Sequence, residues 1–363
     1  MAYDKVINSK MGGAILKKPR SSNLELYRII CMLLIVAHHF VVNSGVAKDG
    51  GPISLNPESF NSLFLTVFGA WGKTGINCFL MITGYFMCTS SISLRKFLKL
   101  MLQIYFYNIV IYCIFLISGH EVLSMRHLIN VFVPFWGLSS GFVSCFIVFY
   151  LTIPFWNILI RNMNKKEHGL LLILLLTCYT LFGSIPTFEI TFNYITWFGV
   201  IYLIASYIRL YPQPLFSRRP LWGLLTVSLV ALAIVSIVVL MKMHHSAYLL
   251  VSDCNKLFAV AIATTSFLWF KNMDIKYNKL INAFGAASFG VLLIHANSAA
   301  MRSWLWEDIV NVVGHYSMPP INLVLFCLGT VLTIFIVCNL IDQLRIATFE
   351  KWFFNWYDSR FAR

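Results

Sequence analysis

The chain has 363 residues, of which 59% are hydrophobic and only 12% are charged, and its mean hydropathy is +0.75. A soluble domain cannot bury that much apolar surface, so the composition predicts a polytopic membrane protein. The formal net charge of +14 would also suit a nucleic-acid-binding protein, but the distribution of the charges along the chain favours membrane orientation and no nucleic acid.

Ten apolar stretches are each close to the ~20 residues that cross a bilayer as a helix. They cover residues 24–45, 62–88, 97–118, 140–160, 169–186, 192–211, 221–241, 255–270, 280–300 and 320–343. The sequence therefore predicts an all-α bundle of about ten transmembrane helices over residues 23–345. A cytoplasmic segment, 1–22, precedes this domain, and a basic-aromatic cytoplasmic tail, 346–363, follows it and is expected to lie on the inner membrane surface.

The positive charges fix the expected orientation. If the N-terminus is placed in the cytoplasm, each inner segment carries at least three of the 28 Lys and Arg residues, and no outer segment carries more than two. This is the positive-inside bias of membrane proteins, and it predicts that both termini are cytoplasmic. No small-residue cleavage site follows the first apolar stretch, so we interpret that stretch as a retained span rather than a signal peptide.

The first span carries ionisable residues at both ends, Glu25 and Arg28 at one and His38 and His39 at the other. Such groups are costly in a membrane and are functional candidates by default. Arg28 and His39 are eleven residues apart, roughly 20° past three helical turns. They should share one face, about 16 Å apart, and look into one cavity, with Glu25 orienting the guanidinium of Arg28. Alternatively, Arg28 reaches the headgroups and the histidines lie near the far interface.

The second span combines several glycines with polar residues, which is unusual for a helix that faces lipid. Small residues let helices approach closely, and polar residues belong in the interior of the bundle. Lys73 and Asn77 are four residues apart and share a face. Lys73 is a candidate for lining a cavity inside the bundle, and it is equally well explained as a lysine at the outer interface.

The spacing Arg28-x10-His39, with Glu25 three residues before the arginine, resembles the first span of the membrane acyltransferase-3 family. These are bacterial O-acyltransferases that modify surface polysaccharides and related envelope glycans. The resemblance extends over about residues 20–345. It implies a multi-pass protein of the bacterial plasma membrane that moves an acyl group to a glycan hydroxyl.

Two later stretches strengthen the resemblance. Residues 75–86 are similar to the family's second span, and residues 287–297 resemble its Gly-x-Tyr-Leu-x-His signature, with Leu292 in place of the tyrosine. His295 of this signature is expected in the outer half of the bundle, at a depth like that of His39. The alternative for His295 is a buried histidine bonded to a carbonyl. Beyond it, Trp304 and Trp306 suit an aromatic belt at the interface.

The start of the third span carries Arg95, Lys96 and Lys99. The family has an arginine-rich stretch here that contacts coenzyme A phosphates, so the resemblance implies that these three residues bind acyl-CoA. Gln103 and Lys99 stand where further arginines are common, and ordinary inner-surface charge explains the cations equally well. Downstream, Pro134 and glycines break the segment 131–141, which predicts an interfacial or re-entrant element on the outer side.

These features lead to a mechanistic hypothesis. Acyl transfer from a thioester to a hydroxyl needs a base, and imidazole suits that role near neutral pH. It also needs a donor that stabilises the oxyanion. We predict His39 as the base, with Lys73 or Asn77 stabilising the oxyanion and His38 and His295 supporting. Direct transfer and a covalent acyl relay through His39 both remain open.

The implied co-substrate is acetyl-CoA or another acyl-CoA, with no permanently bound cofactor and no metal. The implied acceptor is an envelope polysaccharide or its lipid-linked precursor, and the other partners are membrane lipids. A competing hypothesis is a transporter that exports a glycan or lipid-linked sugar, and a third is a sensor or scaffold with vestigial acyltransferase residues. Activity of purified protein with acetyl-CoA and a glycan would distinguish the enzyme from both.

Overall fold

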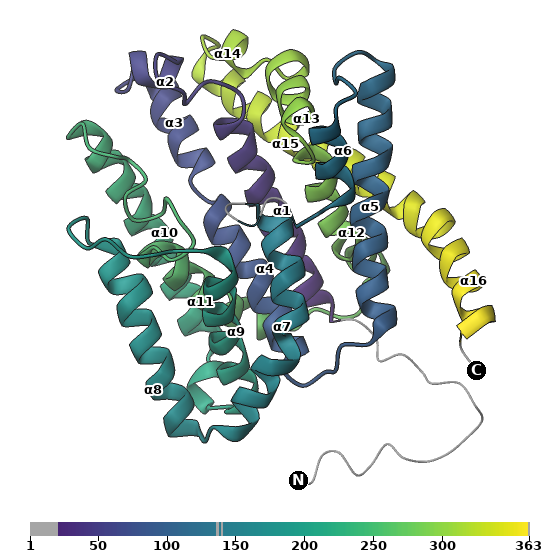
Figure 1. Cartoon of the computed structure of the whole chain (residues 1–363). Helices are drawn as coiled ribbons and strands as arrows, with labels where there is room; N and C mark the ends of the chain where they lie inside the picture. The colour runs from purple at the N-terminus through teal and green to yellow at the C-terminus, as the bar shows by residue number, and fades with distance from the viewer. Residues whose placement is uncertain (1–20, 136–137, 139–140, 362–363) are drawn as a thin grey trace.

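The computed structural model describes residues 21–135, 138 and 141–361, and this part of the chain is all-α (Figure 1). The longer helices are α1 (Ser22–Val42), α3 (Phe60–Gly69), α4 (Gly72–Met87), α5 (Leu94–Ile117), α6 (Met125–Phe132), α7 (Phe142–Asn162), α8 (Lys165–Leu176), α9 (Tyr194–Leu210), α10 (Arg219–Lys242), α11 (Leu257–Lys271), α12 (Lys279–His295), α15 (Pro320–Arg345) and α16 (Lys351–Phe361). Short helices are α2 (Pro52–Leu55), α13 (Ala299–Ser303) and α14 (Val312–His315), with π or 3-10 turns η1 (Thr177–Leu181), η2 (Phe182–Ser184), η3 (Pro214–Ser217), η4 (Trp304–Ile309) and η5 (Ile346–Glu350). Most of the predicted segment 1–22 and part of the predicted element 131–141 lie outside the described residues.

The predicted class, a polytopic all-α membrane protein, is confirmed. Seven stretches of the described chain are long and apolar enough to cross a membrane, or eight if the bent pair Lys279–His295 and Ala299–His315 is one span. The count of about ten is not confirmed. Two of the expected spans, α9 and α11, are apolar helices of 17 and 15 residues, shorter than the ~20 residues that span a bilayer.

The outward faces of the long helices are apolar. On α10 the exposed side chains include Leu224, Val227, Leu232 and Val235, each more than half exposed. On α15, Leu325, Leu340 and Leu344 are likewise more than half exposed. Apolar surface of this extent is stable next to lipid rather than water, so these helices line the perimeter of the bundle.

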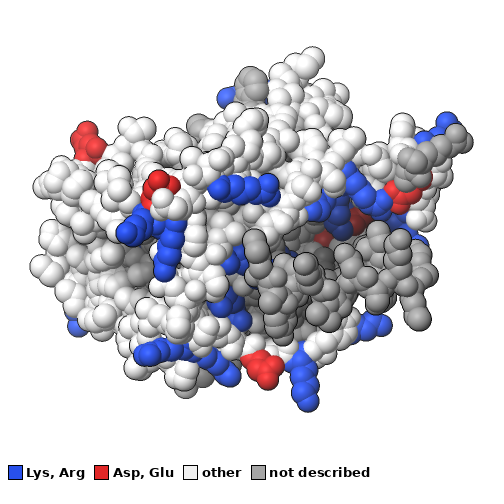
Figure 2. Space-filling model, turned by 90° about the horizontal axis from the view of Figure 1, so that it is seen from below, with Lys and Arg blue, Asp and Glu red and all other residues white. Residues whose placement is uncertain are grey.

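The two ends of the bundle differ in charge. The start of α5 and the link between α7 and α8 lie at the lower end, while α2, α13 and α14 lie at the upper end (Figure 1). Viewed from below, Lys and Arg side chains are more prominent than Asp and Glu (Figure 2). The segments predicted to be inner and outer thus lie at opposite ends, and the positive-inside bias makes the lower end the cytoplasmic one in the predicted topology.

Helix α1 lies at the centre, packed against α3, α4, α12 and α15 (Figure 1). Glycines of the second span make its contact with α1 very close. A Cβ atom on Gly72 would lie 2.3 Å from Cγ of His38, and one on Gly75 would lie 2.9 Å from the carbonyl oxygen of Cys31. The close approach expected from small residues therefore positions the histidine end of α1 against α4.

The predicted span 62–88 corresponds to one candidate membrane span, Phe60–Met87, within which the helix is interrupted at residues 70 and 71. The break leaves the carbonyl group of Gly69 available, and Nδ1 of His38 lies 2.6 Å from its oxygen. A carbonyl can only accept, so His38 donates from Nδ1. The break in the helix thus fixes the orientation of an imidazole on the neighbouring helix.

Packing between α12 and α15 allows a direct test. A Cβ atom on Gly290 would lie 2.2 Å from Cγ of the buried Asp342, whereas one on Gly329 would meet nothing within 4 Å. Gly290→Ala is expected to destabilise the fold by about 1–3 kcal/mol through overpacking. Gly329→Ala should be neutral or stabilising by about 0.5–1 kcal/mol, because alanine is the better helix former. Thermal unfolding in detergent measures both, and equal midpoints for the two variants would contradict the close contact.

Candidate active site

A cavity of about 760 Å³ lies between the upper parts of α1, α4, α5 and α12 and the segments around α6 and the start of α7. Its size is within the range of small-molecule binding sites. Its wall combines apolar side chains with polar and ionisable ones. The latter are His38, His39, Asn43, Lys73, Asn108, Tyr112, Glu121, His127, Asn130, Ser144, Tyr194, Asn297, Ser298 and Arg302.

The structure joins the two histidines that the sequence singled out on the first and ninth spans. Nδ1 of His39 lies 2.9 Å from Nε2 of His295, and Nδ1 of His295 lies 2.6 Å from the carbonyl oxygen of Val291. His295 must donate to that carbonyl from Nδ1. In the neutral pair its Nε2 is therefore an acceptor, and His39 donates from Nδ1. This arrangement leaves Nε2 of His39 as the basic nitrogen of a residue that lines the cavity.

Aromatic packing supports the His39–His295 pair. Trp306 is fully buried, with its ring edge-on to His295 at 6.2 Å and to Phe40 at 5.9 Å between ring centroids. The expectation that Trp306 belongs to an interfacial belt is therefore wrong. The chain bends by 98° after α12, which carries Trp306 back into the bundle rather than along the membrane surface.

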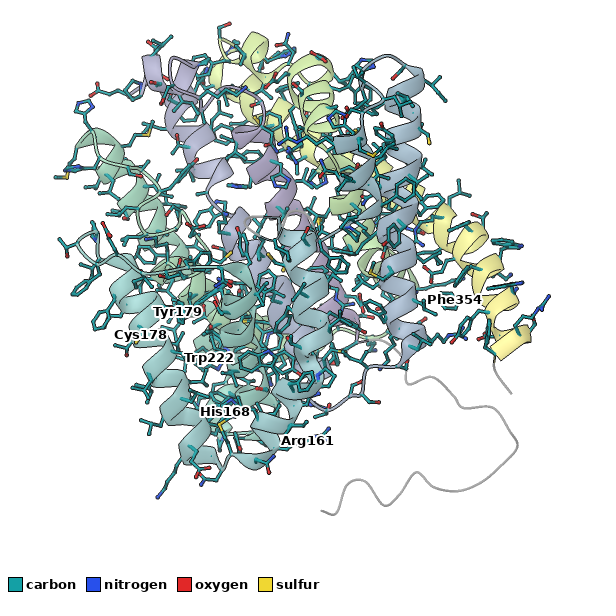
Figure 3. The ribbon with its side chains drawn as sticks, viewed as in Figure 1. Arg161, His168, Cys178, Tyr179, Trp222 and Phe354 are labelled. Atoms are coloured by element: carbon teal, nitrogen blue, oxygen red, sulfur yellow. The ribbon has the colours of Figure 1, made fainter. Side chains whose placement is uncertain are left out.

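His38 also lines the cavity, and its ring lies 5.8 Å from that of His39. A third buried histidine, His168, provides a contrast. It lies near the lower end of α8 (Figure 3), bonds the carbonyl of Leu203 at 3.1 Å, and is not among the residues that line the cavity. His168 has the contacts of a structural histidine, whereas His38 and His39 are both available to a ligand.

Glu25 and Arg28 lie at the opposite end of α1. Nη1 of Arg28 contacts both carboxylate oxygens of Glu25, at 3.0 and 3.2 Å, as expected for residues three apart. Arg28 is not among the residues that line the cavity. The expectation that Arg28 and His39 look into one cavity is therefore not met by this cavity, which His39 lines and Arg28 does not.

Lys73 and Asn77 share a helical face, but only Lys73 lines the cavity. Nζ of Lys73 bonds the hydroxyl of Tyr194 at 2.6 Å and pairs with Asp253 at 3.3 Å. The fully buried Asn77 donates to the carbonyl of Cys254 at 2.6 Å and accepts from the indole of Trp197 at 2.9 Å. The amide of Asn77 thus links α4 to α9 and to the segment before α11, which argues against its predicted contact with an oxyanion.

The three predicted acyl-CoA-binding cations begin α5 at the lower end of the bundle. Arg95 pairs with Asp358 and Lys99 pairs with Glu350, both in the C-terminal segment. Lys96 donates to the hydroxyl of Ser90 and the carbonyl of Ser91, each at 2.8 Å. These residues do not line the cavity, and their predicted contact with acyl-CoA stays a prediction.

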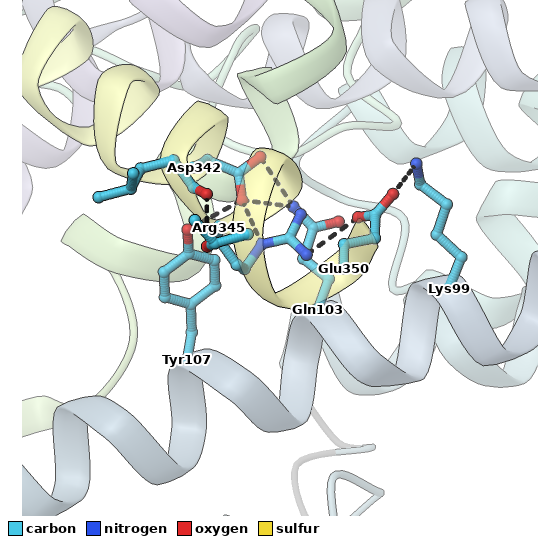
Figure 4. Close-up of polar contacts among 8 residues, drawn as sticks. Lys99, Gln103, Tyr107, Asp342, Arg345 and Glu350 are labelled. Carbon is cyan, nitrogen blue, oxygen red and sulfur yellow. Dashed lines mark hydrogen bonds and ion pairs between the residues drawn. The ribbon is translucent and has the colours of Figure 1, made fainter. Parts of the chain in front are cut away.

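Next to Lys99, a buried polar network links α5 to the end of α15 (Figure 4). Arg345 donates from Nε to Asp342 at 2.7 Å and from Nη1 to Glu350 at 3.0 Å. Tyr107 and Gln103 of α5 also donate to Asp342, at 2.8 and 3.2 Å. Arg345 belongs to a segment predicted to be cytoplasmic, yet its side chain is 1% exposed.

Several cavity residues were not singled out from the sequence. From the sequence, Arg302 was noted only as one of the 28 cations, yet it lines the cavity. Its Nη1 donates to the carbonyl of Ala296 at 3.3 Å, and no carboxylate in the described part of the chain forms an ion pair with it. Glu121 and His127, which form a pair at 2.8 Å, also line it. The only available signal was that these are polar residues at predicted outer ends of spans.

The fold and the site together define a polytopic membrane protein with a histidine-lined cavity. Residues 21–339 match the model of the family described as an acyltransferase domain. The chain therefore belongs to the membrane acyltransferase-3 family, as the motifs on its first, second and ninth spans suggested. No curated protein and no solved structure matches the chain significantly.

Proposed function

We propose that the protein is a membrane O-acyltransferase that moves an acyl group, acetyl in the simplest case, from acyl-CoA to a hydroxyl of a cell-envelope polysaccharide or its lipid-linked precursor. The observation that carries the proposal is the chain of contacts from Val291 through His295 to His39. It orients a neutral imidazole at the cavity and leaves its second nitrogen available to take a proton.

In the reaction, Nε2 of His39 takes the proton of the acceptor hydroxyl as the oxygen attacks the thioester carbonyl. The tetrahedral intermediate then expels the thiolate of coenzyme A, which receives the proton from the imidazolium. Among the cations of the cavity, Lys73 already has Asp253 and Tyr194 as partners. Arg302 has no described carboxylate partner and retains most of its five N–H donors, so it replaces Asn77 as a candidate for stabilising the oxyanion.

The proposed setting is the bacterial plasma membrane, with the cavity in the half of the bundle that the predicted topology places outside. Acyl-CoA would approach from the cytoplasmic end, where the cations of α5 lie, and the acceptor from the cavity. The acyl group must then pass the apolar residues between Arg28 and His39, which a small acetyl group does most easily.

Mass spectrometry of surface glycans tests the proposal without knowledge of the acceptor. Cells that produce the protein should carry O-acyl groups that cells lacking it do not, with a mass increase of one acetyl group per modified sugar. Purified protein in detergent should also release coenzyme A from acetyl-CoA when glycan from cells that lack the protein is added. Identical glycans in both strains, with no transfer by the purified protein, would favour the transporter hypothesis instead.

A further inference from the structure

The cavity has two chemically different walls. One comes from α1, α4 and α12 and carries the histidines. The other comes from α5 and α6 and presents Asn108, Tyr112 and Asn130, together with Glu121 of the connection between these helices. The second wall takes no part in the proton transfer proposed above, so its polar groups need another explanation.

The polar groups of the second wall are incompletely satisfied. The buried hydroxyl of Tyr112 has no hydrogen-bond partner within the described part of the chain, and the same holds for Nδ2 of Asn43 on the adjoining edge of the cavity. Asn108 makes only long contacts, at 3.4 Å to the carbonyl of Val131 and 3.3 Å to Asn297. A buried polar group without a partner costs about 1–3 kcal/mol, and a ligand with hydroxyl groups would remove that cost.

The chemistry of the wall selects the kind of ligand. Amide and phenol groups both donate and accept hydrogen bonds, as do the neighbouring hydroxyls of a sugar ring. Glu121 is 14% exposed and its carboxylate lies 2.8 Å from Nδ1 of His127, so it adds a hydrogen-bond acceptor to the wall. Aromatic residues of the same cavity, Phe115 and Phe142, offer apolar surface to the faces of a ring. A lipid alcohol would leave most of these polar groups unpaired.

We propose that the α5–α6 wall is the acceptor subsite: it binds one glycosyl unit through its hydroxyl groups, with Tyr112 and Glu121 as specificity-determining residues, and directs a further hydroxyl to His39. This inference rests on the proposed acyltransferase function. It adds that acceptor selection resides on α5 and α6, which line the cavity but do not carry the proton-accepting histidine.

The test uses the full-length protein in detergent, acetyl-CoA, and surface glycan from cells lacking the protein after alkaline removal of O-esters. Tyr112→Phe removes one hydroxyl that has no partner in the protein, so it should leave the fold intact. We expect the KM for glycan to rise about 5- to 10-fold, the loss of roughly one hydrogen bond, while the KM for acetyl-CoA changes less than twofold. Glu121→Gln, which keeps the shape of the side chain, should also raise the KM for glycan.

Tyr105→Phe is the matched control. Tyr105 is on the same helix, donates to the carbonyl of Phe132 at 3.3 Å, and does not line the cavity. The kinetic constants of the Tyr105→Phe variant should therefore equal those of the wild type. If Tyr112→Phe and Glu121→Gln both retain the wild-type KM for glycan, the proposal of an acceptor subsite is overturned, while the proposed acyltransferase function still stands. If the wild type transfers no acyl group to the glycan, the proposed function fails and the subsite with it.

Discussion

His39→Ala is expected to lower the rate of acyl transfer about 10²- to 10⁴-fold, the usual contribution of a general base. The imidazole lines the cavity, and His295 holds its Nδ1 at 2.9 Å. His295→Leu should cause an intermediate loss, because it leaves His39 without the acceptor that fixes its tautomer. The measurement is release of coenzyme A from acetyl-CoA in the presence of glycan, by protein purified from membranes in equal amounts.

His38→Ala provides the comparison, since His38 lines the same cavity but bonds the carbonyl of Gly69 instead of a second imidazole. It should cost less activity than His39→Ala. The pH profile gives a second criterion: the fall in rate at acidic pH reflects protonation of the base, so it should disappear from the residual activity of His39→Ala. Near wild-type activity of His39→Ala, with His38→Ala inactive, would transfer the role of base to His38.

Most of the helical framework could be predicted from the sequence, because apolar runs of span length and their flanking charges are local signals. The first span, expected at 24–45, is α1 at Ser22–Val42, and the third, expected at 97–118, is α5 at Leu94–Ile117. The contact between Glu25 and Arg28 was predictable for the same reason, since helical spacing alone brings residues three apart together.

The site was only partly predictable, because its cavity depends on contacts between distant segments. His39 and His295 are 256 residues apart, and their hydrogen bond follows from the packing of α1 on α12. The break at residues 70–71 and the bend after His295 have no periodic signal, yet they bring Gly69 to His38 and Trp306 to His295. Net charge likewise could not reveal which cations are buried.

Arg345→Met is expected to destabilise the fold by about 3–5 kcal/mol, the effect of breaking a buried ion pair from one side. Arg345 is the cation that bridges two buried carboxylates, Asp342 and Glu350 (Figure 4). Without it, Lys99 is the cation that the described part of the chain still places against these carboxylates, through Glu350. Thermal unfolding in detergent, followed by the fluorescence of the ten tryptophans, measures the change.

Arg360→Met is the matched control, because Arg360 lies on the same C-terminal segment but is exposed to solvent, and it should change the unfolding midpoint little. Adding Asp342→Asn to Arg345→Met should restore part of the lost stability, since it removes one of the two carboxylates left without their cation. Equal midpoints for Arg345→Met and Arg360→Met would show that the network does not stabilise the fold. A double variant less stable than Arg345→Met would instead show that the hydrogen bonds from Tyr107 and Gln103 to Asp342 matter more than its charge.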